Sequence, residues 1–288
     1  MIRYTPYTET DQNNTVKTPF QIYKEAVARC DESKKNTLQG IEATILGYYN
    51  EFDSHLLPQS IHSILSHGIA NPEAAMLRSL YSSKAAVIKR IKNYFNNEFP
   101  NRIYRNACPY CGLPGAGTTE HILPKEIYPE YAINTLNLLP CCNICNSGKG
   151  QRVKDAMGNA EFINFYYHDI ESEEFLKADI TFDSNGKPQF AFCLEFKPGM
   201  DSVLMRVIGN HYDNLHLLSR YISLADSKYA ECEQTILTLA SGRTDIIEIL
   251  SYFKEMIEQS FGRNHYYSAM LRSMVESIDY HNYILGII

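Results

Sequence analysis

Apolar residues recur at helical spacing through the first hundred positions of the chain. Phe20, Tyr23 and Val27 fall on one face of a helix, because intervals of three and four residues separate them. The same alternation of apolar and polar positions extends from residue 18 to about residue 97. This region is therefore predicted to form a set of helices, preceded by a polar segment over residues 1–17.

One of these helices has a recognisable start. Asn71 can cap the first turn, Pro72 suits the first helical position, and an acidic side chain follows near the positive end of the helix dipole. The apolar pattern after this point predicts a helix that runs to about Phe95, with a break at Ser82-Ser83.

Strand patterns appear in the second half of the chain. Residues 162–167, FINFYY, are apolar and aromatic, which predicts a buried strand. Residues 175–183 and 189–196 are joined by the turn-rich sequence SNGKP. This arrangement predicts a hairpin of two antiparallel strands.

Helical spacing returns after Asp201. A long helix is predicted over about residues 211–239, and a second one over about residues 244–261. Residues 108–154, in contrast, are rich in proline and glycine, which favours a small irregular module over a packed layer of helices.

These patterns predict a mostly helical α+β fold with three regions. An N-terminal helical region covers residues 1–100, a compact module covers residues 101–160, and a hairpin followed by helices covers residues 161–288. A hydrophobic content of 44% and a charged content of 21% are ordinary for a soluble globular protein. No apolar run approaches the roughly 20 residues that span a bilayer. The first 20 residues also lack the apolar segment of a secretory signal. We therefore expect a cytoplasmic protein with no membrane partner.

The charged residues are unevenly distributed. The chain carries a net charge of −6, but residues 161–288 contain 19 acidic and 10 basic side chains, whereas residues 1–160 contain 14 and 17. The acidic excess therefore lies outside the first part of the chain. Such an acidic part is typical of a protein-docking surface or of a plain solvated face, and the sequence leaves both open.

Basic side chains gather just ahead of the proline- and glycine-rich module. They are Lys84, Lys89, Arg90, Lys92, Arg102 and Arg105. Two interpretations of this stretch stand side by side, a phosphate-binding surface and an exposed helix face.

Cysteines are concentrated inside the module. Five of the eight fall within 38 residues: Cys108, Cys111, Cys141, Cys142 and Cys145. Disulfides are rare in a reducing cytosol, so clustered cysteines indicate a metal site. Each CxxC pair, Cys108 with Cys111 and Cys142 with Cys145, can place two thiolates on one side of a tight turn. Two such turns complete a tetrahedral zinc site.

The remaining cysteines are assigned no ligand role. Cys141 is expected to be a spare beside the second pair. Cys30, Cys193 and Cys232 are expected to be buried thiols that pack as small hydrophobic side chains.

Polar residues in a fixed order lie between and after the cysteine pairs. Glu120-His121 opens the run EHILP, Asn137 opens NLLPCC, and Asn146 opens NSGK directly after the last cysteine. In this order and spacing, residues 105–154 resemble the HNH endonucleases. An Asn stands at the third signature position, where other members of that family have a second His.

The resemblance implies a ββα-metal fold and a phosphodiester hydrolase. His121 would be the general base that activates water. Glu120 and Asn146 would give oxygen ligands to a catalytic Mg²⁺ or Mn²⁺ ion. Asn137 would hold the loop that orients His121, and the zinc ion would be purely structural.

DNA is the substrate that the HNH resemblance implies. Lys149 would lie early in the helix of the module, where it could touch a backbone phosphate, with Arg152 and Lys154 nearby.

A narrower resemblance rests on the run IYPEYAI, residues 127–133, which leads to Asn137. A Tyr-Pro-Glu segment at this place resembles the HNH proteins of bacterial anti-phage systems, the Septu type and the retron-associated effectors. In those systems an ATPase accompanies the nuclease. The resemblance therefore implies an ATPase partner that restrains or triggers the activity.

Two alternatives to a DNA nuclease remain at this stage. A non-catalytic zinc module that binds nucleic acid or docks a partner needs the four cysteines of the CxxC pairs. It does not need Glu120, His121 and Asn146 at these offsets. A nuclease directed at RNA is the other alternative, although the aromatic patterns of RNA-recognition modules are not evident.

Overall fold

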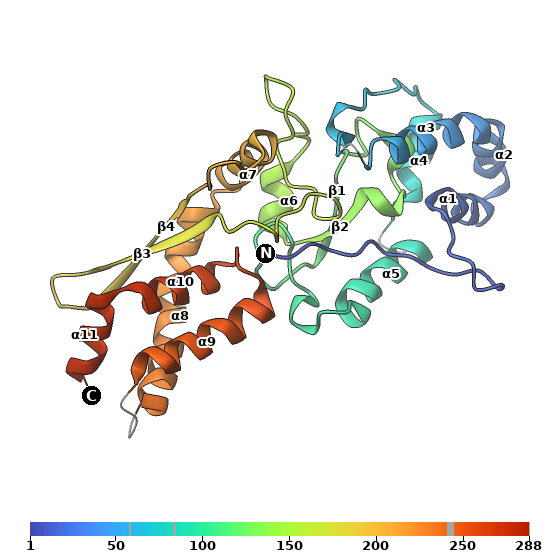
Figure 1. Cartoon of the computed structure of the whole chain (residues 1–288). Coiled ribbons are helices and arrows are strands. Elements are labelled where there is room, and N and C mark those ends of the chain that lie inside the picture. Colours follow the sequence, from blue (N-terminus) through green and yellow to red (C-terminus); the bar gives the residue numbers. More distant parts are fainter. Residues whose placement is uncertain (58, 83–84, 241–244, 288) are drawn as a thin grey trace. The chain divides into compact units, whose positions relative to one another are not determined.

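The structure is a computed structural model that describes residues 1–57, 59–82, 85–240 and 245–287. Its internal contacts divide the chain into two units, and each is described by itself. The N-terminal unit spans Arg3–His168, and the C-terminal unit consists of Met1–Ile2 and Asp169–Ile288 (Figure 1). Helices predominate among the described residues, beside two small antiparallel sheets. The predicted mostly helical α+β class is thereby confirmed.

The N-terminal unit places most of its helices before a short hairpin and a final helix. Its helices are α1 (Pro19–Ala28), α2 (Glu32–Gly40), α3 (Glu42–Ser54), α4 (Glu73–Leu80), α5 (Ala86–Asn93) and α6 (Asn143–Lys149). Its strands are β1 (Thr118–His121) and β2 (Leu138–Cys141). Its short helical turns are η1 (Ile61–Ser63), η2 (Tyr94–Glu98), η3 (Arg102–Tyr104), η4 (Pro129–Tyr131) and η5 (Thr135–Asn137).

Helix α1 begins where its sequence provides a complete cap. The Thr18 side chain accepts a hydrogen bond from the Gln21 backbone N–H, and the Gln21 side chain accepts one from the Thr18 N–H. This capping box satisfies backbone donors that have no partner inside the helix. The apolar face predicted from Tyr23 and Val27 is buried, which confirms the helical interpretation of this segment.

The helix predicted from Asn71 to Phe95 is two helices. Helix α4 starts at Glu73 with Pro72 as its N-cap, so the assignment of the cap to Asn71 was wrong. It ends at Leu80, and α5 begins at Ala86. The predicted break at Ser82-Ser83 falls between them, although Ser83 and Lys84 lie outside the described residues.

The core of the N-terminal unit joins the early helices to the loop between β1 and β2. Phe52 from α3 packs with Tyr131 from η4, their ring centroids lying 5.0 Å apart. The Tyr131 hydroxyl also donates a hydrogen bond to the Tyr48 carbonyl at 3.0 Å. Leu123 and Ile133, which flank η4, are buried in the same cluster. The helical region therefore supports the loop from which the candidate site is built.

The strand predicted over residues 162–167 is wrong. The segment consists of turns and irregular backbone, although Phe165 and Tyr166 are fully buried. The Asn164 side chain accepts a hydrogen bond from the Tyr166 N–H, and the Phe165 carbonyl accepts one from Tyr4. An apolar run indicates burial but does not by itself indicate a strand. Here hydrogen bonds within a local turn satisfy backbone groups that would otherwise pair with a neighbouring strand.

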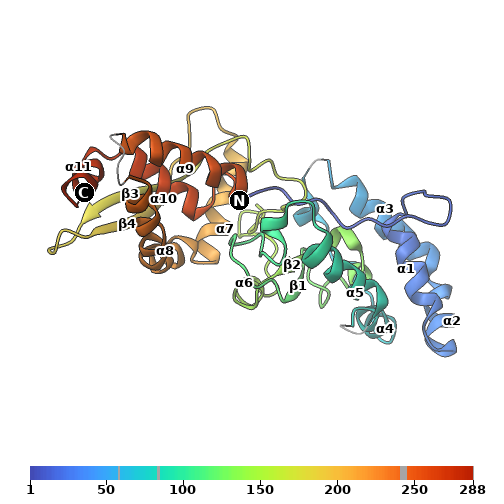
Figure 2. The ribbon, with the colours of Figure 1, turned by 90° about the horizontal axis from the view of Figure 1, so that it is seen from below.

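The C-terminal unit consists of a hairpin covered by helices. Its elements are β3 (Leu176–Phe182), β4 (Pro188–Leu194), α7 (Ser202–Asn214), α8 (Leu217–Ala240), α9 (Ile246–Phe261), α10 (Tyr266–Glu276) and α11 (Ile278–Ile287). Helix α10 packs on β3 and α8 packs on β4, as the view from below also shows (Figure 2). The predicted hairpin is confirmed. The helix predicted over about residues 244–261 is observed as Ile246–Phe261, and residue 244 lies outside the described residues.

The long helix predicted over residues 211–239 is interrupted near its start. Helix α7 ends at Asn214, and α8 begins at Leu217. His216, between them, has a φ of 51°. This left-handed conformation ends the α-helical hydrogen-bond pattern, and the side-chain periodicity gave no sign of it.

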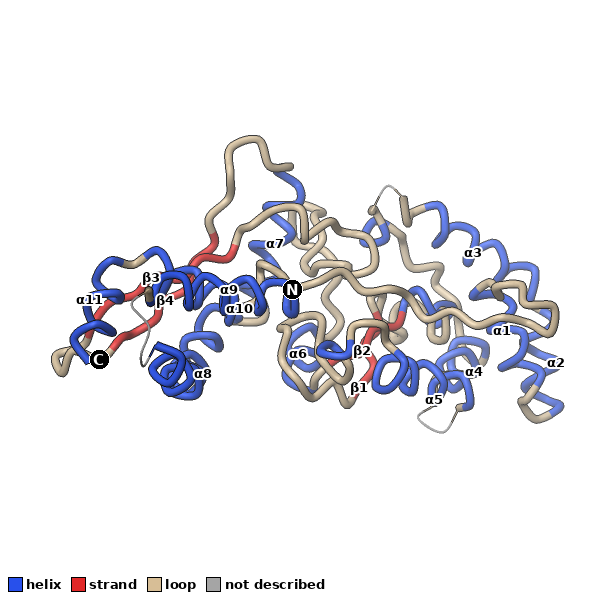
Figure 3. Tube along the Cα trace, turned by 60° about the horizontal axis from the view of Figure 1, so that its bottom comes forward, coloured by secondary structure: helices blue, strands red, loops and turns tan. Residues whose placement is uncertain are grey.

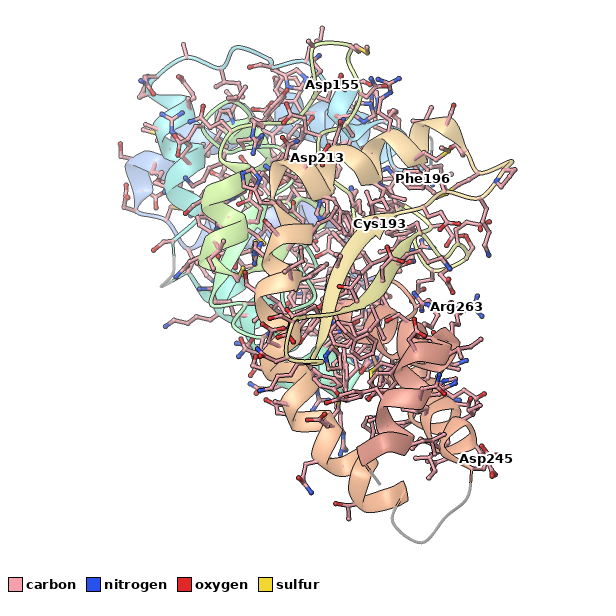
Figure 4. The ribbon with its side chains drawn as sticks, turned by 90° about the vertical axis from the view of Figure 1, so that its left-hand side faces the viewer. Asp155, Cys193, Phe196, Asp213, Asp245 and Arg263 are labelled. Atoms are coloured by element: carbon pink, nitrogen blue, oxygen red, sulfur yellow. The ribbon has the colours of Figure 1, made fainter. Side chains whose placement is uncertain are left out.

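Cys193 contradicts the prediction that it is a buried thiol. Its neighbours Phe190 and Phe192 on β4 are buried, whereas Cys193 is exposed, because side chains alternate between the two faces of a strand (Figure 4). Cys232 is buried as predicted, and Cys30 is half-buried.

None of the described helices combines the length and the apolar character that crossing a membrane requires.

Candidate functional site

The two CxxC pairs come together in the folded chain. Cys108, Cys111, Cys142 and Cys145 are buried, and their sulfur atoms all lie within 4.8 Å of one another. A tight turn shapes the first pair, in which the Gly112 N–H donates to the Cys108 carbonyl at 2.7 Å and Gly112 has a φ of 74°. In the second pair, the Cys145 N–H points at the Cys142 sulfur at 3.4 Å.

This cluster fits a structural zinc ion. Four thiolates are the soft ligands that zinc prefers, and a Zn–S distance of ~2.3 Å separates tetrahedral sulfurs by roughly 3.8 Å. The Cys111 and Cys142 sulfurs are 3.9 Å apart. Cys141, predicted to be a spare, is buried beside the cluster with its sulfur 3.8 Å from that of Cys108.

The cluster fastens both ends of a strand–strand–helix unit. Strands β1 and β2 are antiparallel, with Thr118 opposite Cys141 and His121 opposite Leu138. Cys142 then caps α6, which packs on β1. Figure 3 shows how short these strands are and how much loop surrounds them. A metal bound to the four thiolates would cross-link the segment before β1 to the start of α6 and would add to the stability that packing supplies.

Two pairs of side chains link β1 to α6. Thr118 and Glu120 lie two residues apart on a strand and therefore share a face. Asn146 Nδ2 donates to Thr118 Oγ1 at 3.0 Å, and Lys149 Nζ lies 2.8 Å from Glu120 Oε1. The structure thus brings Glu120 and Asn146, the two predicted ligands of the divalent ion, to one strand–helix interface.

Glu120 and Lys149 form a buried ion pair. Their side chains are only 7% and 2% exposed, and Lys149 Nζ also donates to the His121 carbonyl at 2.9 Å. Burial raises the pKa of Glu120 and lowers the pKa of Lys149, while the attraction between the two opposes both shifts. Lys149 was predicted to lie early in the helix and to meet a phosphate, but it is the last residue of α6 and its ammonium faces inward.

His121 ends β1 and is held in a defined orientation. Its Nε2 donates to the Ala132 carbonyl at 2.9 Å, and its ring packs against the Tyr81 ring in a T-shaped arrangement with the centroids 4.5 Å apart. Burial lowers the pKa of His121 to about 4, so the imidazole is neutral at pH 7. With the proton on Nε2, the Nδ1 lone pair is available, and no partner for it is found among the described residues.

Asn137 ties together the loop between β1 and β2. Its Oδ1 accepts from the Leu123 N–H at 2.7 Å, while its Nδ2 donates to the carbonyls of Leu123 and Tyr131 at 3.0 and 3.1 Å. The side chain is fully buried. These are the contacts expected of a residue that fixes a loop, because a buried amide with three partners has no alternative conformation of similar energy.

The donor chemistry at the β1–α6 interface fits a divalent ion such as Mg²⁺. Glu120 offers a carboxylate, and the contact of Asn146 Nδ2 with Thr118 leaves the amide oxygen of the half-buried Asn146 for a hard cation. An ion bound to Glu120 would either share the carboxylate with the Lys149 ammonium or displace it.

The basic residues outside the interface have mixed surroundings. Lys154 is exposed, and Arg152 lies over the Phe162 ring, 5.3 Å from its centroid. In the stretch before the module, Arg90 is engaged by Glu9 at 2.8 Å, so it belongs to an internal ion-pair network. Lys89 is exposed.

Sequence reasoning missed three contributors to this site. Thr118 could have been found, because it lies two residues before Glu120 on a predicted strand. The Tyr81 ring could not, because it lies on a distant segment of the chain that carries no motif. Ala132 lies within the run IYPEYAI, but a backbone carbonyl gives no sequence signal of its role.

The chain is similar to two known proteins over part of its length. It is 29% identical to "Septu protein PtuB" of Bacillus thuringiensis over 140 residues, 47% of this chain and 48% of PtuB. It is 46% identical to "Protein ea31" of Escherichia phage lambda over 46 residues, 15% of this chain and 16% of ea31. The matches thus cover about half of PtuB and about a sixth of ea31. No family model and no solved structure matches the chain.

Proposed function

We propose that the chain is a metal-dependent endonuclease of the HNH type that hydrolyses DNA phosphodiester bonds in bacterial anti-phage defence. The order of Glu120, His121, Asn137 and Asn146 around the CxxC pairs supports the nuclease assignment. The likeness to a Septu protein supports the defence context. The Tyr-Pro-Glu segment, which resembles the same group of proteins, is a second support.

One observation carries the proposal, namely the state of His121. A surface histidine would be solvated and mobile. His121 is instead buried, neutral at pH 7, and fixed through Nε2 by a backbone carbonyl. Nδ1 is therefore the basic nitrogen, at the end of the strand that also carries Glu120. At pH 7 a positioned neutral imidazole can accept a proton from water, but a pKa of about 4 makes it a weak base, so more of the activation of that water would fall to the divalent ion.

In the proposed reaction each residue has a separate role. His121 Nδ1 takes the proton from the attacking water, and the Ala132 carbonyl stabilises the ring as it becomes cationic. Glu120 and Asn146 would hold the divalent ion, which would supply charge stabilisation at the scissile phosphate and at the leaving oxygen. Asn137 keeps the loop in place, so that Ala132 faces His121. Arg152 and Lys154 contact backbone phosphates.

Lys149 takes a role different from the phosphate contact that the sequence suggested. Its buried ammonium balances the Glu120 carboxylate at the β1–α6 interface. We propose that this charge keeps Glu120 ionised and oriented before the divalent ion arrives.

The proposed activity includes a protein partner. Residues 161–288 carry 19 acidic against 10 basic side chains, which suits a protein surface better than a phosphate backbone. We propose that an ATPase component docks there and controls the nuclease.

A non-catalytic zinc module is the second candidate, and one observation favours it. The Glu120–Lys149 pair is a complete buried ion pair, and such a pair can fulfil a purely structural role with no divalent ion.

The deciding experiment measures cleavage of supercoiled and linear DNA, with RNA in parallel, by zinc-loaded protein with Mg²⁺ or Mn²⁺. The wild type is compared with His121→Ala and with a matched control, His55→Ala, whose Nδ1 hydrogen-bonds the Ser60 hydroxyl outside the candidate site. Divalent-dependent cleavage that His55→Ala retains and His121→Ala loses supports the nuclease. Equal cleavage by all three proteins excludes His121 as the base. DNA binding without cleavage favours the second candidate.

A further inference from the structure

A histidine outside the HNH motif lies between two carboxylates. His67, in the loop between η1 and α4, has Nδ1 2.6 Å from Glu130 Oε1 and Nε2 2.7 Å from Glu51 Oε2. Glu51 belongs to α3, and Glu130 belongs to η4. The His67 ring also stacks on Tyr48, with centroids 3.6 Å apart. The imidazole therefore connects the helical region to the loop between β1 and β2.

The three groups differ in burial. The Glu130 side chain is 0% exposed, that of His67 is 16% exposed, and that of Glu51 is 39% exposed. Glu130 Oε2 is buried and has no hydrogen-bond partner among the described residues. His67 is therefore the group on which the buried carboxylate depends for compensation.

The contacts of His67 define its role in this cluster. Each ring nitrogen faces a carboxylate oxygen, so one imidazole connects Glu130 to Glu51. Because Glu130 is the fully buried member, its contact with His67 offsets the removal of the carboxyl group from water. Replacing His67 by a neutral group would leave the buried Glu130 without that compensation.

Further hydrogen bonds join the same two segments. The Tyr128 hydroxyl donates to the Ile64 carbonyl at 3.0 Å, and the Ser66 hydroxyl donates to the Ile127 carbonyl at 3.0 Å. The loop that carries His67 is thus fastened to the Tyr-Pro-Glu segment along its length.

The Tyr-Pro-Glu segment leads directly to the candidate base. Ala132, whose carbonyl receives the N–H of His121, is two residues after Glu130. The carbonyl of the intervening Tyr131 accepts a hydrogen bond from Asn137. A shift of Glu130 would therefore move the acceptor that fixes the tautomer and the ring orientation of His121.

We propose that His67 is a positioning residue for His121, acting through Glu130 to hold the Ala132 carbonyl. The proposal rests on the proposed function, because it gives His121 a reaction to perform. It also assigns a role to the Tyr-Pro-Glu segment that the nuclease assignment leaves unexplained.

The test uses the zinc-loaded full chain with ¹⁵N-labelled histidines. His67→Gln leaves Glu130 buried without compensation, whereas His67→Gln/Glu130→Gln removes that charge as well. Glu42→Gln is the control, because Glu42 lies on the same helix as Glu51 but forms its ion pair with Lys24, away from His67. The ring ¹⁵N shifts of His121, assigned with His121→Ala, report its tautomer, and DNA cleavage gives kcat and KM.

The single variant should lose the Nε2-protonated signature of His121 and lower kcat by about tenfold to a hundredfold, with KM changed by less than about twofold. The double variant should restore the signature and most of kcat, and Glu42→Gln should match the wild type. An unchanged His121 signature in His67→Gln overturns the proposal. If His67→Gln does not fold, Glu51→Gln must shift the same resonances to a smaller extent, and no shift there overturns the proposal. Failure of the wild type to cleave DNA would refute the nuclease, yet the ¹⁵N shifts would still test the link from His67 to His121.

Discussion

The β1–β2 hairpin of the N-terminal unit and the β3–β4 hairpin of the C-terminal unit are both antiparallel pairs, but their side chains are distributed differently. Along β4, buried and exposed residues alternate, and Phe190 and Phe192 face the covering helices. Strand β2 is buried throughout, and β1 buries Glu120 and His121. The β3–β4 hairpin is a half-exposed structural layer. The β1–β2 hairpin is a buried polar unit in which Glu120 and His121 both have partners, which is where function is expected.

The largest expected effect is unfolding after the loss of zinc. We expect the β1–β2 hairpin to depend on the metal and the β3–β4 hairpin to be independent of it. Cys145→Ser should remove a zinc ligand and unfold the β1–β2–α6 unit, because metal binding of ~10–16 kcal/mol stabilises structural zinc sites. Zinc content and limited proteolysis are the measurements. We expect new cleavage within residues 108–154 and continued protection of residues 176–194. Cys193→Ser, at an exposed position of β4, is the matched control and should keep both the bound zinc and the resistance to protease. A zinc-free Cys145→Ser protein with the protease resistance of the wild type would contradict the role of the metal.

The next effect concerns the charges buried in the first hairpin. Lys149→Met leaves the Glu120 carboxylate buried without a cation, and such a change costs about 3–5 kcal/mol of unfolding free energy. Added Mg²⁺ should restore part of this stability if Glu120 is a metal ligand, because an ion that binds only the folded state stabilises it. Thermal unfolding with and without Mg²⁺ is the measurement.

The matched variant for that experiment is Lys149→Met/Glu120→Gln. It lacks the carboxylate and should recover stability without responding to Mg²⁺. If the single variant is equally insensitive to Mg²⁺, Glu120 does not hold the ion, and the zinc-module candidate gains support.

The sequence located the site better than it described the contacts within it. The CxxC pairs and the Glu120-His121 step are local in sequence, so their spacing was sufficient to find them. The partners of Glu120 and His121 are not local: Lys149 lies 28 residues from His121, and Ala132 lies 11 residues away. The spacing of the motif predicts that the module's helix carries Lys149, and a lysine on such a helix suggests a phosphate contact. Whether its side chain is exposed or buried depends on tertiary packing, which the spacing does not show.

The same distinction explains the errors in the fold. The β3–β4 hairpin was predicted because alternation and a turn sequence are local signals. Residues 162–167 were misassigned because their apolar character reflected burial, and the partner of Phe165 is Tyr4, far away in the chain. His67 escaped attention for the same reason, since its two carboxylate partners lie 16 and 63 residues away.

A smaller effect is expected from the loop between β1 and β2. Asn137→Ala removes three buried hydrogen bonds and should lower the unfolding free energy by about 2–4 kcal/mol, since buried groups left unsatisfied cost ~1–3 kcal/mol each. Chemical denaturation measures the loss. Asn137→Asp keeps the acceptor but not the two donated bonds, so it should be intermediate or worse. Thr181→Ala on β3 is the comparison from the other hairpin and should change stability by less than about 0.5 kcal/mol. Equal losses of unfolding free energy in the Asn137 and Thr181 variants would mean that the Asn137 hydrogen bonds do not stabilise the loop.

The smallest expected effect compares one exposed lysine beside each hairpin. Lys154 follows α6 at the proposed DNA surface, and Lys187 lies in the turn between β3 and β4. Lys154→Gln should weaken DNA binding uniformly across sequences and reduce the slope of log affinity against log salt by about 1, because one phosphate contact releases about one counterion. Lys187→Gln should leave the slope unchanged. Binding measured over a series of salt concentrations with non-cleavable DNA distinguishes the two. Equal slopes for both variants would mean that Lys154 does not contact a DNA phosphate. The DNA backbone would then have to be contacted by Arg152 without Lys154, or by the exposed Lys89 on α5.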